Sequence, residues 1–251
     1  MNETRIIMGM PVTIRIVAPA GKRAAAVAAA EAAFAYFVSV DERFSTYKDG
    51  SEISRINRGE ILEAEWSADM KEVMAEAERT KRETGGRFDI VDRSGSFDPS
   101  GLVKGWAIAR AARMISDAGF PDSLVDAGGD IQASGTNERG EPWEIGIRSP
   151  FDQSAIVKTV RLSGAAIATS GTYVRGQHIY DPLDKDRPLT DVASLTVVGP
   201  DIYDADRFAT AAFAMGADGI SFIGGLPGLE GYQIGSDGIA AMTAGFFRYT
   251  S

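Results

Sequence analysis

Residues 97–135 read FDPSGLVKGWAIARAARMISDAGFPDSLVDAGGDIQASG, and this stretch decides the fold class of the chain. Apolar side chains recur at intervals of three and four between residues 103 and 118, which predicts a helix with one buried face. Gly119 ends that helix, and Leu124-Val125 begins a short buried strand that leads to Gly128-Gly129-Asp130. A loop, a helix and a strand therefore follow one another directly.

One cation, Lys104, stands where the loop runs straight into this helix. Backbone amides at a helix start attract anions, so a lysine beside them suits a phosphate group. An ordinary loop-helix-strand unit with packing glycines is the alternative, and the spacing alone favours it. The loop matches neither a Walker loop, which requires Gly-Lys-Ser/Thr, nor a G-x-G-x-x-G turn.

The composition narrows the class of protein. The 251 residues are 44% hydrophobic and 24% charged, values typical of a soluble globular protein. A net charge of −9 without a basic run argues against nucleic-acid and anionic-membrane partners. The chain has no cysteine, so disulfides, thiolate metal sites and a cysteine nucleophile are excluded. The N-terminal residues show neither a signal-peptide pattern nor a lipidation cysteine, so we expect a cytoplasmic protein.

The remaining segments mix helices and strands without regular βαβ alternation, which favours an α+β fold in one compact domain over residues 1–251. Periodicity and caps predict further helices over 21–38, from the cap Ser67 to Gly85-Gly86, and over 204–215. Alternation predicts strands over 5–17, 143–147, 156–162 and 194–198, and two or three short strands in 231–249 with a turn at 236–238.

Seven ordered blocks give the chain a resemblance to a known family. Residues 98–107 followed by 125–131 resemble the central block of the ApbE family, whose members are FAD:protein FMN transferases. The other blocks, in the family's order, are 8–15, 44–57, 84–89, 166–171, 178–182 and 205–211. The resemblance implies an α+β, T-fold-like domain with a mixed, mainly antiparallel sheet and flanking helices.

Two oxygen-bearing side chains share one face of the predicted helix over 204–215. Asp206 and Thr210 are four residues apart, and a carboxylate with a hydroxyl suits a hard cation such as Mg²⁺. A surface aspartate near a helix start with a half-buried threonine is the alternative reading. The resemblance implies that both are metal ligands and adds the main-chain carbonyl of Val103.

His178 is the only histidine of the chain, so any imidazole acid–base chemistry depends on it. A lone histidine is more often structural than catalytic, but the resemblance implies that His178 assists removal of a proton from the acceptor hydroxyl. Such a base works best with a pKa near the working pH. Asp181 either orients the ring or caps a turn, and we interpret it as a turn residue.

Aromatic and polar side chains near the predicted helix ends are candidate flavin contacts, because aromatic faces stack on flat rings. Phe88 alone would be interpreted as a core residue. The resemblance implies FAD contacts at Met8, Ser45, Tyr47, Arg87, Phe88, Asp89, Ser100, Lys104, Trp106, Thr169, Ser170, His178 and Ile179.

The reaction implied by the resemblance is Mg²⁺-dependent transfer of FMN from FAD to a Thr or Ser hydroxyl of an acceptor protein, with release of AMP. FAD and that acceptor are then the expected partners, and a homodimer is compatible with them. Two alternatives stay open: a pyrophosphatase that hydrolyses FAD to FMN and AMP, and a protein that binds FAD without chemistry.

Overall fold

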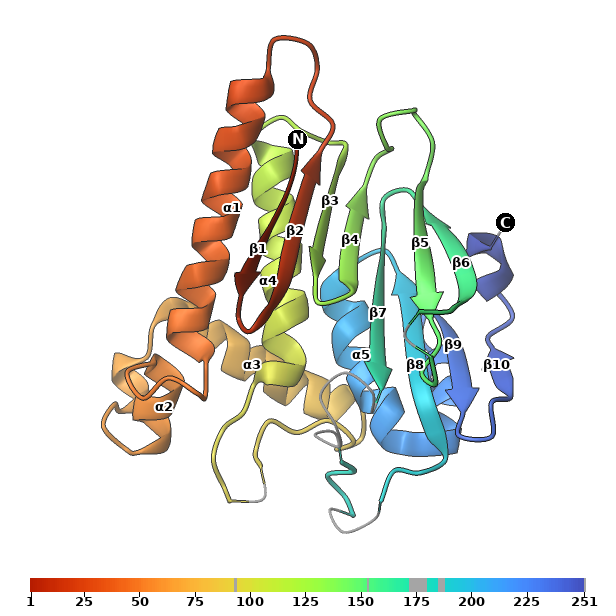
Figure 1. Cartoon of the computed structure of the whole chain (residues 1–251). Helices are drawn as coiled ribbons and strands as arrows, with labels where there is room; N and C mark the ends of the chain where they lie inside the picture. The colour runs from red at the N-terminus through yellow and green to blue at the C-terminus, as the bar shows by residue number, and fades with distance from the viewer. Residues whose placement is uncertain (93, 153, 172–179, 185–187, 251) are drawn as a thin grey trace.

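An antiparallel sheet forms the centre of the computed structural model, which describes residues 1–92, 94–152, 154–171, 180–184 and 188–250 (Figure 1). Its strand order is β1-β2-β3-β4-β7-β8-β9-β10, and every pair in the described residues is antiparallel. These strands are β1 Asn2–Ile7, β2 Met10–Ile16, β3 Ser123–Ala127, β4 Asp130–Ser134, β7 Ala165–Gly171, β8 Val192–Gly199, β9 Glu230–Gly235 and β10 Ala240–Met242.

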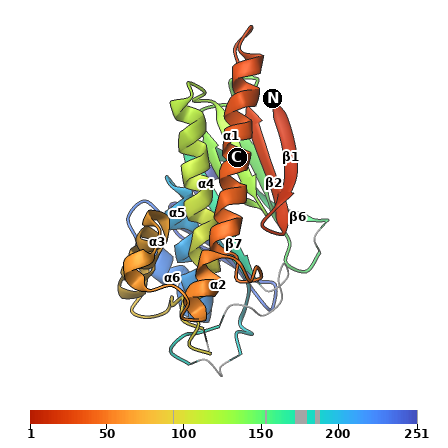
Figure 2. The same ribbon diagram turned by 90° about the vertical axis from the view of Figure 1, so that its left-hand side faces the viewer.

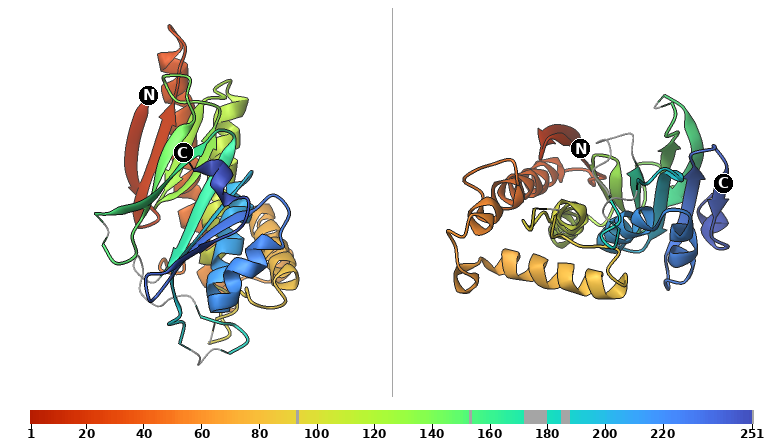
Figure 3. Two further views of the ribbon diagram at one scale, coloured as in Figure 1. Left: turned by 90° about the vertical axis from the view of Figure 1, so that its right-hand side faces the viewer. Right: turned by 90° about the horizontal axis from the view of Figure 1, so that it is seen from below.

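The helices gather on one face of this sheet, and α1 and α4 run side by side along it (Figure 2). They are α1 Arg23–Phe44, α2 Glu52–Asn57, α3 Ala68–Glu83, α4 Ser100–Asp117, α5 Ile202–Met215 and α6 Gly219–Gly224. A separate hairpin, β5 Trp143–Arg148 with β6 Ile156–Leu162, lies on the opposite face (Figure 3). Three layers result, and the expected α+β class with flanking helices is confirmed.

Each face of the sheet has its own apolar core. The larger core joins the inward side chains of β2 and β3, such as Val12, Ile14 and Val125, to α1, α4 and α5. The smaller core lies under the hairpin and includes Trp143 and Ile147. Side chains of a strand point to opposite faces in turn, so one sheet supplies both cores.

The first segment differs from the prediction. Residues 5–17 were expected to form one strand, but β1 and β2 form a hairpin with a two-residue turn at Met8-Gly9. Both turn residues have positive φ, 55° and 70°. This is the conformation that lets a tight turn follow the twist of the flanking strands, and glycine adopts it without a steric cost.

The helix predictions are confirmed with shifted ends. α1 continues past residue 38 because Val40 and Phe44 extend its buried face. α3 begins after Ser67, whose Oγ accepts a hydrogen bond from the Met70 amide at 3.2 Å. α5 begins two residues early, since the Asp201 side chain caps it. By length and composition α1 is apolar enough to cross a membrane, yet one apolar face of it packs into the larger core.

The tail contains two strands, within the two or three expected. β9 and β10 are joined by a turn that includes the predicted residues 236–238. The segment after them, Phe246–Tyr249, is a single 3₁₀ turn whose Phe246 is buried against Tyr232 of β9. The apolar residues of this last segment are therefore explained by packing under the β5–β6 hairpin and not by strand pairing.

Candidate active site

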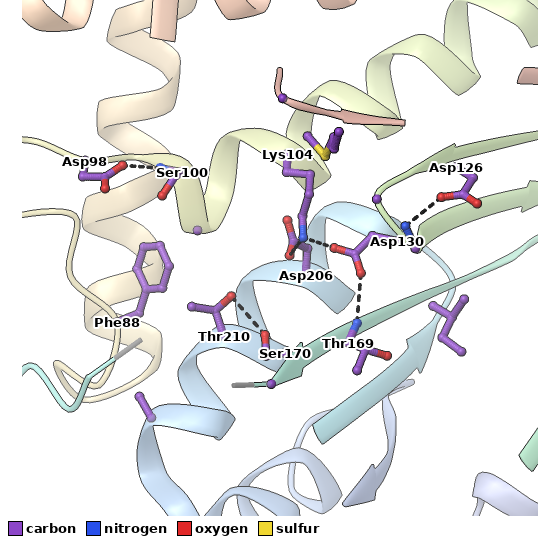
Figure 4. Close-up of a pocket in the computed structure, with 18 of the residues that line it drawn as sticks. Phe88, Asp98, Ser100, Lys104, Asp126, Asp130, Thr169, Ser170, Asp206 and Thr210 are labelled. Carbon is purple, nitrogen blue, oxygen red and sulfur yellow. Dashed lines mark hydrogen bonds and ion pairs between the residues drawn. The ribbon is translucent and has the colours of Figure 1, made fainter. Parts of the chain in front are cut away.

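A cavity of about 630 Å³ opens where the start of α4, the middle of α5, the β3–β4 turn and the end of β7 meet (Figure 4). The hairpin closes its outer side through residues 145–148. Chain segments from residue 9 to residue 214 therefore contribute to one site. Its described lining holds six aspartates (Asp89, Asp92, Asp98, Asp126, Asp130 and Asp206) but only three basic residues (Arg87, Lys104 and Arg148).

Lys104 lies between two buried carboxylates at the centre of the cavity wall. Its Nζ forms an ion pair with Asp130 and lies 3.3 Å from Asp206 Oδ1. Both aspartate residues are only 2% exposed. Among the described residues, one lysine thus faces two acids that are shielded from bulk water, and its single positive charge does not balance both of them if both are ionised.

Asp206 is held in place by the close packing of α4 on α5. Its Oδ2 accepts a hydrogen bond of 2.7 Å from the amide of Gly105. A Cβ at Gly105 would lie 2.7 Å from the Asp206 Cβ and 2.9 Å from the Ile202 carbonyl, so only glycine allows this approach. Burial raises the pKa of Asp206 to about 7, and the negative charge of Asp130 adds to the shift while Lys104 opposes it.

Hydroxyl groups complete this part of the wall. Thr210, one turn along α5 from Asp206, has its Oγ1 3.4 Å from Ser170 Oγ on β7. The neighbouring Thr169 donates its backbone N–H to Asp130 Oδ1 at 3.0 Å. Carboxylate and hydroxyl oxygens from α5, β4 and β7 are thereby brought to one place (Figure 4).

The start of α4 lies at the same cavity. The amide of Ser100 donates to the Asp98 carboxylate at 3.0 Å, and Gly101 packs against the Phe88 ring and the Thr210 methyl. A Cβ at Gly101 would lie 3.3 Å from each of those two side chains. The first helical turn therefore brings the Gly101 backbone to the cavity, whereas the amides of Ser100, Leu102 and Val103 already donate to Asp98 and Pro99.

The structure brings most of the predicted site residues together. Those that line the cavity are Arg87, Phe88, Asp89, Ser100, Lys104, Thr169, Ser170, Asp206 and Thr210. His178 and Ile179 lie outside the described residues, but Gly171 and Tyr180, which flank that gap, both line the cavity. Asp181 accepts a hydrogen bond from the Leu183 amide at 3.0 Å, which confirms its interpretation as a turn residue, and it also pairs with Arg87.

Five predicted residues do not belong to the cavity lining: Met8, Ser45, Tyr47, Val103 and Trp106. Met8 lies in the β1–β2 turn beside the lining residues Gly9 and Met10. Tyr47 is 97% exposed in the loop after α1. Trp106 is buried between α1 and α4, where its ring edge meets Phe44 and its indole N–H donates to Glu72.

The aspartates of the β3–β4 hairpin were missed as site candidates. Asp126 and Asp130 flank the turn at Gly128-Gly129, whose positive φ angles turn the chain back toward the cavity. Burial raises the pKa of Asp126, and its Oδ1 accepts the Gly129 amide at 2.8 Å. The Gly-Gly-Asp motif was the available signal, since paired glycines allow close approach to a ligand.

The sequence of this chain is similar to those of known proteins. A sequence model of the ApbE family matches residues 8–94 and 91–232. The chain is 34% identical over 164 residues to the FAD:protein FMN transferase of Vibrio cholerae, covering 61% of this chain and 47% of that protein. It is 26% identical to the Haemophilus influenzae FAD:protein FMN transferase over 242 residues, 71% of this chain and 70% of that one. The chain spans about half the length of the first curated relatives it matches.

Solved structures share the fold. The flavin transferase ApbE from Vibrio cholerae superimposes with a TM-score of 0.85 at 23% identity, covering 99% of this chain and 98% of that one. The ApbE protein from Thermotoga maritima gives 0.86 at 21% identity, covering 100% and 99%. Both likenesses extend over the sheet, the helical layer and the hairpin together.

Proposed function

This chain belongs to the ApbE family, and from that premise we propose that it transfers FMN from FAD to a Thr or Ser hydroxyl of an acceptor protein and releases AMP. We propose further that residues 1–251 act as one domain in this reaction. The observation that carries the proposal is the single cavity in which Lys104, Asp130, Asp206 and Thr210 meet the start of α4.

A divalent cation fits the wall that holds Asp206. Within the described residues no group of three or more His, Cys, Asp or Glu side chains forms a metal cluster, so hydroxyl and backbone oxygens must complete the site. Asp206 and Thr210 supply two such oxygens, and the Val103 carbonyl is the third ligand that the family implies. In the described part of the lining, carboxylates outnumber basic side chains, which supports a cation. Bound Mg²⁺ would neutralise charge on the phosphates of FAD.

FAD is expected to place its pyrophosphate against the first turn of α4, where Ser100, Gly101 and Lys104 line the cavity. The positive end of the α4 dipole and the lysine ammonium would offset the phosphate charge there. Arg87, Phe88 and Asp89 form a second part of the wall, which suits one of the ring systems of FAD.

The transfer exchanges the phosphoanhydride bond of FAD for a phosphoester bond to the acceptor. The acceptor oxygen attacks the phosphorus on the FMN side, a new P–O bond forms, and the P–O bond to the AMP phosphate breaks. AMP leaves with the bridging oxygen and both electrons of that bond, and the hydroxyl proton passes to His178 as general base. The acceptor then carries FMN through a phosphoester, and no electrons are exchanged with the flavin ring.

The test is incubation with FAD and Mg²⁺, with and without a candidate acceptor, followed by AMP assay and intact-protein mass. Transfer predicts AMP together with an acceptor mass increased by FMN. AMP with free FMN and no labelled acceptor would identify a pyrophosphatase instead. Tight FAD binding without AMP in either arm would identify a binding protein. Failure to bind FAD overturns the proposal in all its forms.

A further inference from the structure

A groove follows one edge of strand β5 away from the active-site cavity. Residues 145–148 of β5 line that cavity, and residues 143–145 line a second cavity of about 310 Å³. The two cavities therefore meet at Ile145. Residues of β6 line neither of them, so both lie on the side of β5 that faces away from its partner.

That side of β5 is an unpaired strand edge within the described part of the chain, because β5 pairs only with β6. The Ser149 amide donates to Ala155 at 2.8 Å across the hairpin, and amides alternate between the two edges of a strand. The amides of Glu144, Gly146 and Arg148 consequently point to the unpaired edge. Five steps of about 3.4 Å each give an edge about 17 Å long from Trp143 to Arg148.

Strands β2 and β3 form the floor of the groove. Thr13 pairs with Asp126 and Arg15 with Leu124, so these four side chains lie on the outer face of the sheet. Thr13 and Asp126 line the active-site cavity, while Arg15 and Leu124 line the second one. The floor thus runs under β5 from one cavity into the other.

The far end of the groove holds an unsatisfied donor. Arg15 stacks over the Trp143 ring, with its guanidinium carbon 4.9 Å from the ring centre. Its Nε is buried and has no hydrogen-bond acceptor among the described residues. Buried donors without acceptors are rare in proteins, and a carbonyl oxygen from a bound chain would satisfy this one.

We propose that the acceptor protein docks as an extended segment that adds a strand to the free edge of β5 and so carries its hydroxyl into the active-site cavity. This proposal rests on the proposed transferase activity. We assign the acceptor to this groove because the groove opens into the cavity where a protein hydroxyl must react. An unpaired strand edge also binds an extended chain through main-chain hydrogen bonds. Alternate side chains of the segment would face Thr13 and Leu124, and the others would face solvent.

A proline at Glu144 tests the strand addition from the side of the enzyme. Glu144→Pro removes an amide from the free edge without removing a β5–β6 hydrogen bond. The substrate is a library of eight-residue peptides with one central Thr, incubated with FAD and Mg²⁺ and read by mass for FMN. We expect kcat/KM for the best peptide to fall roughly tenfold or more.

Ile6→Pro provides the matched control. The two-residue turn pairs Ile7 with Met10, so alternation points the Ile6 amide to the free edge of β1, outside the groove. We expect it to keep peptide transfer. Equal losses in the two proline variants, or a matching loss of FAD affinity in Glu144→Pro, would overturn the docking mode. If wild-type enzyme binds FAD but modifies a folded acceptor and no peptide, an extended segment is not what docks.

A second measurement needs no variant. The rate of amide hydrogen exchange of residues 143–148 is measured in wild-type protein with and without the best peptide. The measurement is repeated with forms of that peptide that are N-methylated at alternate residues. Strand addition predicts that the amides of β5 exchange more slowly when the peptide is present. It also predicts that this protection is lost when one set of alternate peptide residues is N-methylated and is kept when the other set is N-methylated. Protection that is present without peptide and disappears on dilution would show that a second copy of the chain occupies the edge. If no peptide or protein is modified by wild-type enzyme, the transferase proposal itself fails.

Discussion

Lys104 is the residue on which the charge balance of the site depends. It pairs with Asp130 and lies near Asp206, so two buried acids share one cation. Without a ligand this arrangement lowers the stability of the fold. The repulsion between the two carboxylates and the loss of their hydration together exceed the attraction that one lysine supplies. A site with this imbalance is suited to receive a further cation.

Asp206→Asn tests that balance. The amide keeps the shape of the side chain but removes the charge, so we expect Mg²⁺-dependent AMP release to be lost while the melting temperature without metal is kept or raised. Asp218→Asn, an exposed change just beyond α5, is the control and should alter neither quantity. Full activity of Asp206→Asn in Mg²⁺ would show that this carboxylate is only structural.

His178 carries the prediction for proton transfer. His178→Ala should retain FAD binding and lose FMN transfer by roughly a hundredfold or more, the usual scale for loss of a general base. Single-turnover AMP release at saturating FAD measures the chemical step. A wild-type rate rising with an apparent pKa near about 6.5, and missing from the variant, would identify the imidazole. An unchanged rate would leave only carboxylates as candidate bases.

Asp126 carries a pH-dependent prediction. Burial raises its pKa above the unfolded value, so the folded state binds the proton more tightly and stability falls as pH rises through that interval. Asp126→Asn removes this cost and keeps an oxygen for the Gly129 amide. We expect the variant to melt a few degrees higher than wild type at pH 8. The difference should shrink as the pH falls through the unfolded pKa toward about 3, where the aspartate is largely protonated in both states. A lower melting temperature at pH 8 contradicts the sign.

At the scale of elements, the site depends on how closely α4 and α5 approach. The two helices meet at Gly105, whose amide holds Asp206, and a side chain there has no room. The distance between the two helices therefore sets the position of the Asp206 carboxylate. A shift of α4 would move both Lys104 and the Gly105 amide, which face that carboxylate.

Gly105→Ala should separate the helices locally. We expect a loss of about 1–3 kcal/mol in the free energy of unfolding, as for other overpacked contacts. Transfer activity should fall with it, since Asp206 loses its backbone donor. Gly224→Ala in α6 is the matched control, because its Cβ would meet only the Thr243 methyl at 3.5 Å. Urea unfolding of both variants measures the difference, and equal stabilities would refute the packing argument.

On the scale of the whole molecule, the cavity is assembled from segments between residues 9 and 214. A ligand that contacts the β1–β2 turn, α4, α5 and the hairpin at once binds only the folded chain. Ligand binding must then stabilise the entire fold rather than one element.

FAD should therefore raise the melting temperature of the chain. A ligand at a hundredfold excess over its Kd adds about 2.7 kcal/mol to the free energy of unfolding. We expect the shift to be larger with Mg²⁺ than with chelator, and the Mg²⁺ part to vanish in Asp206→Asn. Thermal unfolding with FAD, and with GTP as the unrelated nucleotide, provides the measurement. Equal shifts with both nucleotides would contradict a flavin site.

Local sequence determined the elements and part of the site. The three-and-four spacing over 103–118 and the cap Ser67 specify α4 and α3, because helix periodicity and capping depend on neighbours in the chain. Asp206 and Thr210 lie on one face of α5 for the same reason. Family motifs added Arg87, Phe88 and Ser100.

Only the tertiary structure decided which side chains meet. The pairing of Lys104 with Asp130 joins α4 to β4, and the groove beside β5 requires the hairpin to fold over β2 and β3. Trp106 lies only two residues from Lys104, yet it turns into the core while Lys104 faces the cavity. Sequence spacing defines the faces of an element, but the choice of partner for each face depends on burial and charge across contacts far apart in the chain.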